Sequence, residues 1–289
     1  MKILICGHRA FAAKGLVGLL KSKGHDVFCF SRGKDGGEGI EGNAVFGRVD
    51  QIDKNQYLNE HFDVVVNFIL LKDDTFENNL AYIEALCRFC KEKNVGKLIH
   101  LSSISSYPND ASTIDEDTDI DHKYQLKGGY GALKVLVDEY LIKQRDEEKL
   151  PVVFVRPGFI MAEDHPSPLG GILKLLPGDI GILMGDKKCS LSVVTRDEMQ
   201  YGLVKIIEDV NPLNVYLLLR SGNHTKLEYA KSKTNAKIIT LPKKLVIMTA
   251  CILKSIHIID DRIYQMVRGQ FKVQTFNADK TYYKIEKFL

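Results

Sequence analysis

A tyrosine and a lysine at helical spacing are the residues of this chain best suited to move a proton. Tyr130 and Lys134 stand four positions apart, so on a helix they would share one face. The ammonium group of Lys134 could then lower the pKa of the Tyr130 phenol from its ordinary value of about 10 toward neutrality. Such a phenol can exchange a proton with a substrate oxygen while a hydride moves to or from a nicotinamide.

A serine upstream could complete this arrangement. Ser102 and Ser103 close an apolar run that begins at Lys97. A strand end there could place the Ser103 hydroxyl beside the phenol, where both would hydrogen-bond the same substrate oxygen. Helix capping or turn formation is the alternative role for these serines. Together, Ser103, Tyr130 and Lys134 predict the catalytic residues of an oxidoreductase.

The turn after the first apolar run could hold a dinucleotide. Such a turn favours glycine at its first, fourth and seventh places, which here are Gly7, Ala10 and Ala13. Alanine is the smallest substitute, so close approach of a pyrophosphate is impaired but still possible. A helix start without any ligand is the alternative. The residues expected to contact a cofactor here are Gly7, Arg9, Ala10, Phe11 and Ala12.

Two charged residues bear on the choice of cofactor. Arg32 ends the second apolar run, where an acidic residue would bind a ribose 2′-hydroxyl. The guanidinium group suits a 2′-phosphate better, because it pairs with phosphate oxygens through two parallel hydrogen bonds. The sequence therefore favours NADP over NAD, although Arg32 could also be a solvated side chain. Asp50 could accept a hydrogen bond from the adenine amine, or it could be a turn residue.

The elements that must position these residues alternate between short strands and helices. This order predicts βαβ units and a doubly wound parallel sheet of the Rossmann type, an α/β fold with ligands at the carboxyl ends of its strands. Strands are expected at 2–6, 26–31, 43–49, 63–71, 97–102 and 151–155, and helices at 12–23, 76–93 and 130–144.

The pattern changes after residue 158. Residues 161–186 are rich in Gly and Pro and are expected to be irregular; a helix over 196–208, a strand over 215–219 and helices from 241 onward should follow. We expect a dinucleotide-binding domain over 1–160 and a smaller, mixed, largely helical substrate-binding lobe over 161–289, with the sheet and helices partly shared. The apolar run 245–253 predicts a buried helix, with an interfacial contact as the alternative, because a membrane span needs roughly 20 residues.

Composition excludes several classes of protein. The chain has 289 residues, 45% of them hydrophobic and 27% charged, as in soluble globular proteins. A formal charge of +3 is too small to argue for nucleic acid as a partner. No signal peptide or stable membrane insertion is expected, so the cytoplasm is the expected location. Cys87 and Cys90 lie in a helical pattern without a second pair, which favours a place in the core over a metal site.

Several short motifs, in order, resemble those of the extended short-chain dehydrogenase/reductase superfamily, the NAD-dependent epimerase/dehydratase family. The resemblance runs from Lys2 to about Ile160. The motifs are Gly7-x-x-Ala10-x-x-Ala13, Asp63 to Phe68, Asn78-Asn79, Leu101 to Pro108, Tyr130-x-x-x-Lys134 and Arg156-Pro157. The resemblance implies that Ser103, Tyr130 and Lys134 are the catalytic triad. The further cofactor residues expected are Phe68, Lys72, Asn78 and Pro157, together with Tyr130 and with Lys134, which would hold the cofactor ribose.

The resemblance also implies a reaction class. NADP-dependent reduction of a keto group on a nucleotide sugar is the leading interpretation, and bacterial surface polysaccharide synthesis is the setting that the family suggests. An NAD-dependent 4-epimerase or dehydratase is the alternative; Arg32 counts against the epimerase, and Ile104-Ser105 stands where dehydratases often carry an Asp-Glu pair. A catalytically weak sensor or assembly factor is a third reading, because of the altered turn. Family members usually pair through two helices, so a homodimer through 76–93 and 130–144 is expected.

Overall fold

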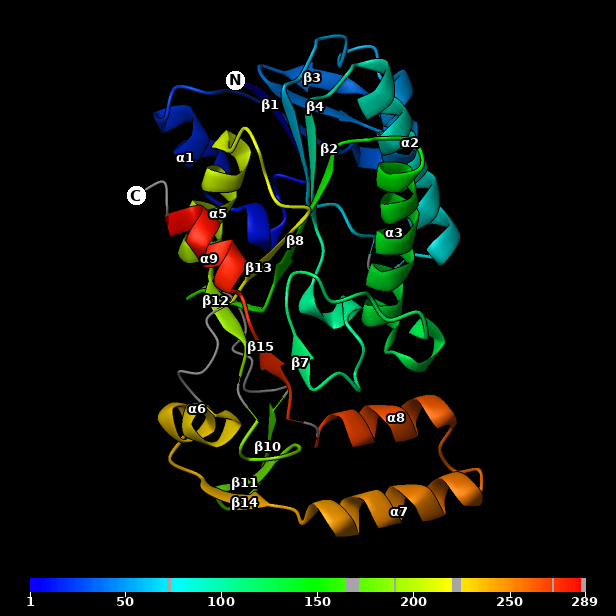
Figure 1. Cartoon of the computed structure of the whole chain (residues 1–289), viewed down its shortest axis with the longest axis vertical. Helices are drawn as coiled ribbons and strands as arrows, with labels where there is room; N and C mark the ends of the chain where they lie inside the picture. The colour runs from blue at the N-terminus through cyan, green and yellow to red at the C-terminus, as the bar shows by residue number, and fades with distance from the viewer. Residues whose placement is uncertain (72–73, 165–171, 190, 220–224, 272, 287–289) are drawn as a thin grey trace.

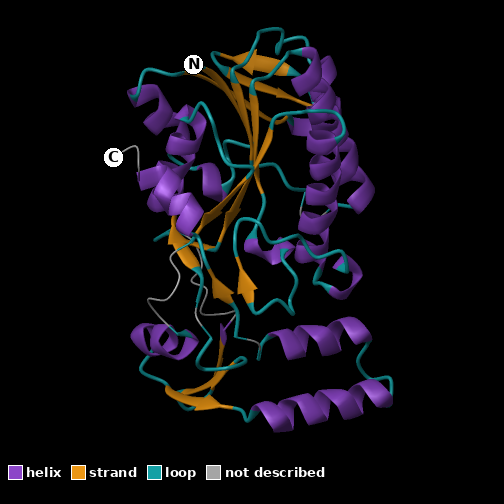
Figure 2. Ribbon diagram, in the orientation of Figure 1, coloured by secondary structure: helices purple, strands orange, loops and turns teal. Residues whose placement is uncertain are grey.

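The computed structural model describes residues 1–71, 74–164, 172–189, 191–219, 225–271 and 273–286. A large sheet with helices on both faces forms the upper part of the molecule in Figure 1, and a smaller group of helices and short strands forms its lower end. Figure 2 shows the same division by secondary structure. The molecule is therefore an α/β fold with a distinct C-terminal lobe.

The main sheet contains eight strands of the described residues in the order β13-β8-β6-β5-β1-β2-β4-β3. All neighbours pair in parallel except β3 and β4. The strand order reverses at β1, so the sheet is doubly wound, as predicted. The strands are β1 (Lys2–Cys6), β2 (Asp26–Arg32), β3 (Gly39–Glu41), β4 (Ala44–Gly47), β5 (Val64–Asn67), β6 (Lys97–Leu101), β8 (Val152–Pro157) and β13 (Val215–Leu218).

Helices cover both faces of this sheet. On one face, α2 (Phe76–Glu92) and α3 (Gly129–Asp146) pack with the 3-10 segment η3 (Val49–Lys54) around one hydrophobic core. On the other, α1 (Leu16–Ser22), α5 (Arg196–Glu208) and α9 (Asp279–Glu286) pack around a second core. Cys87 and Cys90 are buried in α2, where burial raises the pKa of both thiols. Both cysteines belong to the core, as expected.

The helix expected over 12–23 is interrupted. A 3-10 turn, η1 (Phe11–Ala13), comes first, and α1 begins only at Leu16. Gly15 between them has φ +96°, a left-handed conformation that ends helical geometry. Gln200 of α5 packs against Gly15, and its side-chain amide donates a hydrogen bond to the Lys14 carbonyl. This contact with a distant helix fixes the break.

The C-terminal lobe contains strands that the sequence did not indicate. Part of the segment expected to be irregular forms β10 (Leu173–Leu176) and β11 (Ile180–Leu183), which are joined by β14 (Lys237–Thr240) in a small sheet. β9 (Phe159–Met161) pairs with β12 (Val193–Thr195). The helices of the lobe are α6 (Lys226–Lys233), α7 (Lys243–Ser255) and α8 (Asp261–Gly269).

The expectation of a buried helix over 245–253 is wrong. Helix α7 packs on α8, yet only Ala250 of α7 is fully buried. Leu245, Met248 and Ile252 are 51%, 55% and 53% exposed. None of the described helices is long and apolar enough to span a membrane. The apolar run therefore forms a surface helix rather than a core helix.

The last described segment ties the lobe back to the main sheet. Helix α9 follows β15 (Thr275–Phe276), which pairs with β7 (Thr113–Ile114). The Thr281 hydroxyl oxygen accepts a hydrogen bond from the Leu217 amide of β13, and the Tyr282 hydroxyl donates to the Leu219 carbonyl. β13 and α9 are therefore part of the main sheet and of its helical cover.

Candidate active site

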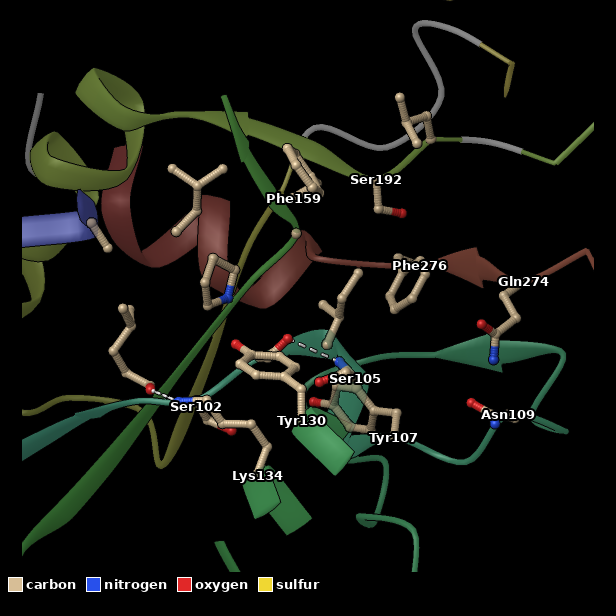
Figure 3. A pocket seen from close by; sticks show the side chains of 18 of the residues that line it. Ser102, Ser105, Tyr107, Asn109, Tyr130, Lys134, Phe159, Ser192, Gln274 and Phe276 are labelled. Carbon is tan, nitrogen blue, oxygen red and sulfur yellow. Dashed lines mark hydrogen bonds between the residues drawn. The ribbon is translucent and has the colours of Figure 1, made fainter. Parts of the chain in front are cut away.

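The hydroxyl groups of Ser103 and Tyr130 meet where β6 and α3 come together. Ser103 follows β6 and caps the 3-10 turn η4 (Ile104–Ser106); its Oγ accepts a hydrogen bond from the Ser105 amide at 3.1 Å. Tyr130 lies in the first turn of α3, and its side chain hydrogen-bonds to that of Ser103. Figure 3 shows the phenol of Tyr130 directed into the cavity beside this turn. The serine and tyrosine predicted from the sequence are therefore in direct contact.

The lysine of the predicted triad lies below the tyrosine. Lys134 is 4% exposed, and its Nζ lies 5.9 Å from the centre of the Tyr130 ring. The ammonium group donates a 2.6 Å hydrogen bond to the Leu101 carbonyl at the end of β6. This bond fixes the lysine between the strand and the helix, on the same side of α3 as the phenol.

The expected lowering of the tyrosine pKa is wrong in this structure. Burial raises the pKa of Tyr130, and the hydrogen bond with Ser103 offsets only part of this effect. The phenol is therefore held in its protonated form, the form that can donate a proton.

A buried ion pair supports the helix that carries these residues. Asp138, one turn beyond Lys134, is fully buried, and its Oδ2 accepts hydrogen bonds from Arg156 Nη2 at 3.1 Å and Ser102 Oγ at 2.7 Å. Arg156 comes from β8 and is 2% exposed; its guanidinium lies 4.7 Å from the centre of the Tyr107 ring. The pair locks α3 to the ends of β6 and β8.

His100 extends this polar network through the sheet. The side-chain oxygen of Asn67, Oδ1, accepts hydrogen bonds from the Tyr82 hydroxyl and the Ile69 amide. The side-chain nitrogen, Nδ2, therefore faces His100 Nδ1 at 3.1 Å and donates to it. The proton of the neutral imidazole is then on Nε2, which lies 3.8 Å from Asp138 Oδ1. Burial, followed by the charges of Lys134 and Arg156, lowers the pKa of His100 well below its ordinary value.

One cavity of about 720 Å³ connects the catalytic candidates with the turn after β1. The turn contributes small side chains, and the ends of β5, β6 and β8 supply the floor (Figure 3). This is the carboxyl edge of the parallel sheet, where ligands bind in doubly wound folds. The predicted site residues that line the cavity are Ala10, Phe11, Ala12, Phe68, Ser103, Tyr130, Lys134 and Pro157.

Other predicted residues lie near this cavity but not in its wall. Gly7 has φ +83°, and a Cβ there would lie 2.9 Å from the Ile69 side chain, so the turn needs glycine at this position. Arg9 is exposed. The side-chain amide of Asn78 donates a hydrogen bond to Asp74 Oδ1. The neighbouring residue, Asn79, is the buried one, and its side chain hydrogen-bonds to the backbone of Leu71. Lys72 lies outside the described residues.

Two further charged residues were predicted to contact the cofactor: Arg32 at the end of β2 and Asp50 in η3. Arg32 is exposed, and its charge adds to the hydrogen bond from Asn78 in lowering the pKa of Asp74. Asp50 is bound through both carboxylate oxygens by Arg48, at 2.7 and 3.3 Å, and this interaction lowers the pKa of Asp50. Asp50 is thus already engaged by a neighbour, which the sequence did not indicate.

The far wall of the cavity consists of residues that the sequence did not single out. Ser192, Asn109 and Gln274 present polar side chains there (Figure 3), and Lys226 of α6 adds a cation whose pKa burial lowers. Nearer the catalytic candidates, the buried Ser105 hydroxyl oxygen lies beside Tyr130 (Figure 3) and has no hydrogen-bond partner among the described residues. These residues come from distant segments, so only the serine run at 102–106 gave a signal in the sequence.

A doubly wound parallel sheet with a cavity at the switch point of its strand order defines a dinucleotide-binding class of fold. The sequence matches the NAD dependent epimerase/dehydratase family over residues 3–176. The match covers more than half of the chain, so the chain belongs to this family. No curated protein sequence is similar enough to be counted as a relative.

Solved structures of similar fold cover nearly the whole chain. UDP-glucose 4-epimerase from Bifidobacterium longum, in complex with NAD+ and UDP, has a TM-score of 0.68 and 17% identity, over 99% of this chain and 92% of that one. dTDP-glucose 4,6-dehydratase from Bacillus anthracis, in complex with NAD, has a TM-score of 0.64 and 16% identity, over 99% and 90%. A human epimerase family protein with NADPH has a TM-score of 0.64 and 16% identity, over 98% and 93%. At these identities the likeness confirms the fold.

Proposed function

We propose that this protein is an NADP-dependent reductase of a keto group on a nucleotide sugar. The observation that carries the proposal is the contact between the Ser103 and Tyr130 side chains, above Lys134, in a cavity that continues to the turn after β1. The residues present fit a nicotinamide dinucleotide, because small side chains at Ala10 and Ala12 leave the turn side of the cavity open toward the phenol.

The chain's own residues would supply the proton chemistry. A bound NADPH would supply the hydride. Tyr130 would donate its phenolic proton to the oxygen of the keto group, and the Ser103 hydroxyl would hydrogen-bond that same oxygen and orient the carbonyl. Lys134, held by the Leu101 carbonyl, would stabilise the phenolate that remains on Tyr130. The raised pKa of Tyr130 suits the reducing direction, because the donor is protonated at neutral pH.

Arg32 supports NADP rather than NAD. Arg32 is the last residue of β2, the strand next to β1, and its guanidinium group is exposed. Its positive charge lowers the pKa of Asp74, so Arg32 lies close to the residues that precede α2. A 2′-phosphate at this position would accept two parallel hydrogen bonds from it. The human epimerase family protein in the comparison was solved with NADPH, which shows that this fold can hold the phosphorylated cofactor.

The substrate class rests on the family and on the far wall of the cavity. The epimerase from Bifidobacterium longum was solved with UDP. In this chain, Ser192, Asn109 and Gln274 could hydrogen-bond sugar hydroxyls, and Lys226 could pair with a phosphate. Arg196, by contrast, is held by Asp164 at 2.7 Å and lies over the Phe11 ring.

Cofactor binding and turnover together test the proposal. Titration with NADPH and with NADH should show tighter binding of NADPH, and Arg32→Ala should weaken NADPH binding about tenfold or more while leaving NADH binding unchanged. Lys21→Ala, at an exposed position on α1, is the matched control. NADPH consumption with UDP-, dTDP- and GDP-linked 4-keto sugars then identifies the substrate. Tightly co-purified NAD, or tighter binding of NADH, would overturn the NADP reductase and favour the epimerase.

A second candidate, a catalytically weak NAD(P)-binding sensor, is favoured by one observation. The helix that should direct its N-terminus at the pyrophosphate is split into η1 and a seven-residue α1, which reduces the dipole available to an anion. NADPH binding without turnover of any keto sugar, unchanged by Tyr130→Phe, would identify this function.

The homodimer remains a prediction. It would form through α2 and α3, which pack side by side on one face of the sheet in Figure 1. Light scattering of the purified protein should give twice the monomer mass, and Phe76→Asp, at a 41% exposed position at the start of α2, should reduce it. Monomer mass for the wild type would show that this pairing does not occur.

A further inference from the structure

The outer face of α7 is an exposed apolar stripe. Leu241, Leu245, Met248, Ile252 and Ile256 recur at helical spacing, and each is between 42% and 57% exposed. At 1.5 Å per residue, the helix itself is about 20 Å long. Monomeric soluble proteins rarely expose a contiguous apolar face of this kind without a partner for it.

The small sheet next to α7 continues this face. Leu173 and Leu183 pair across β10 and β11 and are buried against α6. Side chains alternate along a strand, so the opposite face carries Leu176, paired with Ile180, and Ile239, paired with Ile182. Leu176 and Ile239 are 38% and 40% exposed. Leu173 and Leu183 are therefore covered, whereas Leu176 and Ile239 on the opposite face are not.

These two apolar faces lie at the same end of the molecule. Figure 1 shows β14 running directly into α7 along the lower edge, with α6 above the small sheet and α8 above α7. We call this end the basal surface and define it by the exposed residues Leu176, Ile239, Leu241, Leu245, Met248, Ile252 and Ile256.

The segment that forms the basal surface is strongly basic. Residues 226–268 contain nine Lys or Arg and three Asp or Glu, whereas the whole chain has a formal charge of only +3. The rest of the chain is therefore net negative. Lys237 and Lys244 are both exposed beside the apolar residues. Lys237 and Lys244 therefore place two positive charges next to the uncovered apolar residues, whereas Lys226 lines the cavity of the candidate active site.

The three acidic side chains of this segment are all engaged locally. Glu228 forms a capping box with Thr225 at the start of α6, Asp260 accepts from the Ile263 amide at 2.7 Å, and Asp261 pairs with Lys254. None of these three carboxylates is paired with Lys237 or Lys244.

We propose that the basal surface binds peripherally to an anionic lipid bilayer, with α7 parallel to the membrane plane. An apolar stripe flanked by lysines matches both parts of such an interface, because the apolar side chains enter the acyl boundary while the lysines pair with headgroup phosphates. A second copy of this chain matches less well, since two identical basic surfaces would repel each other.

Vesicle cosedimentation tests this binding. The wild-type chain should sediment with vesicles of phosphatidylcholine and phosphatidylglycerol, should bind at least tenfold more weakly to phosphatidylcholine alone, and should lose binding as salt is raised. The triple variant Leu245→Ser, Met248→Ser, Ile252→Ser should bind at least tenfold more weakly to the mixed vesicles, as should Lys237→Gln with Lys244→Gln. Ile40→Ser, Tyr57→Ser, Val210→Ser, at exposed positions that are not part of the basal surface, is the matched control and should bind like the wild type.

Hydrogen exchange of the wild-type chain gives an answer that does not depend on variants. Mixed vesicles should slow exchange in residues 237–258 and leave α2 and α3 unchanged. No sedimentation with anionic vesicles, equal binding by the triple variant, or no slowing of exchange in α7 would each overturn the proposal. So would a wild-type dimer that the triple variant converts to a monomer while vesicles bind neither form.

Discussion

The two ends of this molecule differ in which side chains they bury: one end buries charged side chains, and the other leaves apolar side chains exposed. Around α3, the charged groups Lys134, Asp138 and Arg156 are buried and bonded to one another or to the backbone, and along α2 and α3 only Phe76 and Tyr130 are large apolar side chains left exposed. Between residues 241 and 266, eight large apolar side chains are exposed. Charged side chains are thus enclosed at one end of the molecule, whereas apolar side chains are uncovered at the other.

Removing the buried guanidinium should give the largest effect. Arg156→Ala leaves the carboxylate of Asp138 buried without its partner, which should lower the free energy of unfolding by about 3–5 kcal/mol. Urea unfolding of the variant measures this. At the basal end, Lys254→Ala removes a partly exposed lysine that pairs with Asp261 and lies over the Tyr264 ring, and it should lower the free energy of unfolding by no more than about 1 kcal/mol. Similar losses from both substitutions would break the comparison.

Removal of the phenol oxygen tests the enclosed site by rate rather than by stability. Tyr130→Phe should lower kcat by about 10²–10³-fold with a true keto-sugar substrate, because general acid catalysis contributes in this range. NADPH binding and the thermal midpoint should stay close to those of the wild type, since Tyr130 is 48% exposed. Unchanged turnover in the variant would contradict the assigned role of the phenol.

The buried imidazole should make the enclosed network sensitive to acid. The pKa of His100 is lowered in the folded state. As the pH falls below about 6.5, His100 therefore binds a proton in the unfolded chain but not in the folded one. Stability should be constant above that value and should fall between pH 6.5 and 5, at up to about 1.4 kcal/mol per pH unit. His100→Asn should flatten this dependence in urea titrations at several pH values, whereas His122→Asn, at an exposed position, should not.

Changes at the basal surface should have the smallest effect on the fold. The triple variant Leu245→Ser, Met248→Ser, Ile252→Ser removes side chains that are already half exposed, so the free energy of unfolding should change by less than about 1 kcal/mol. Turnover in solution should match that of the wild type. A loss comparable with that of Arg156→Ala would show that α7 contributes to the core after all.

The sequence predicted the elements whose pattern is local. The helix at 196–208 has the expected bounds, and the strands at 2–6, 26–32 and 97–101 begin where the apolar runs begin. The neighbours Ser103, Tyr130 and Lys134 followed from helical spacing and from the end of a strand.

Features that depend on distant partners could not be predicted in this way. The break before α1 depends on Gln200, and the small sheet depends on pairing between β11 and β14 across more than fifty residues. The exposure of α7 could not be read from its apolar run, because periodicity identifies an apolar face but not what covers it. The far wall of the cavity was missed for the same reason, since Asn109, Ser192 and Gln274 meet only in the folded chain.

The return of β13 and α9 to the main sheet also constrains how the protein folds. β13 pairs with β8 only after the chain has passed through β9 to β12. The Leu217 amide and the Leu219 carbonyl then still need their hydrogen-bond partners, which are the side chains of Thr281 and Tyr282 near the end of the described chain. During synthesis, the edge of β8 would stay unpaired until about sixty further residues, as far as the end of β13, had left the ribosome. Such an exposed edge, in a topology of high contact order, makes slow folding and self-association of nascent chains the main risk in producing this protein.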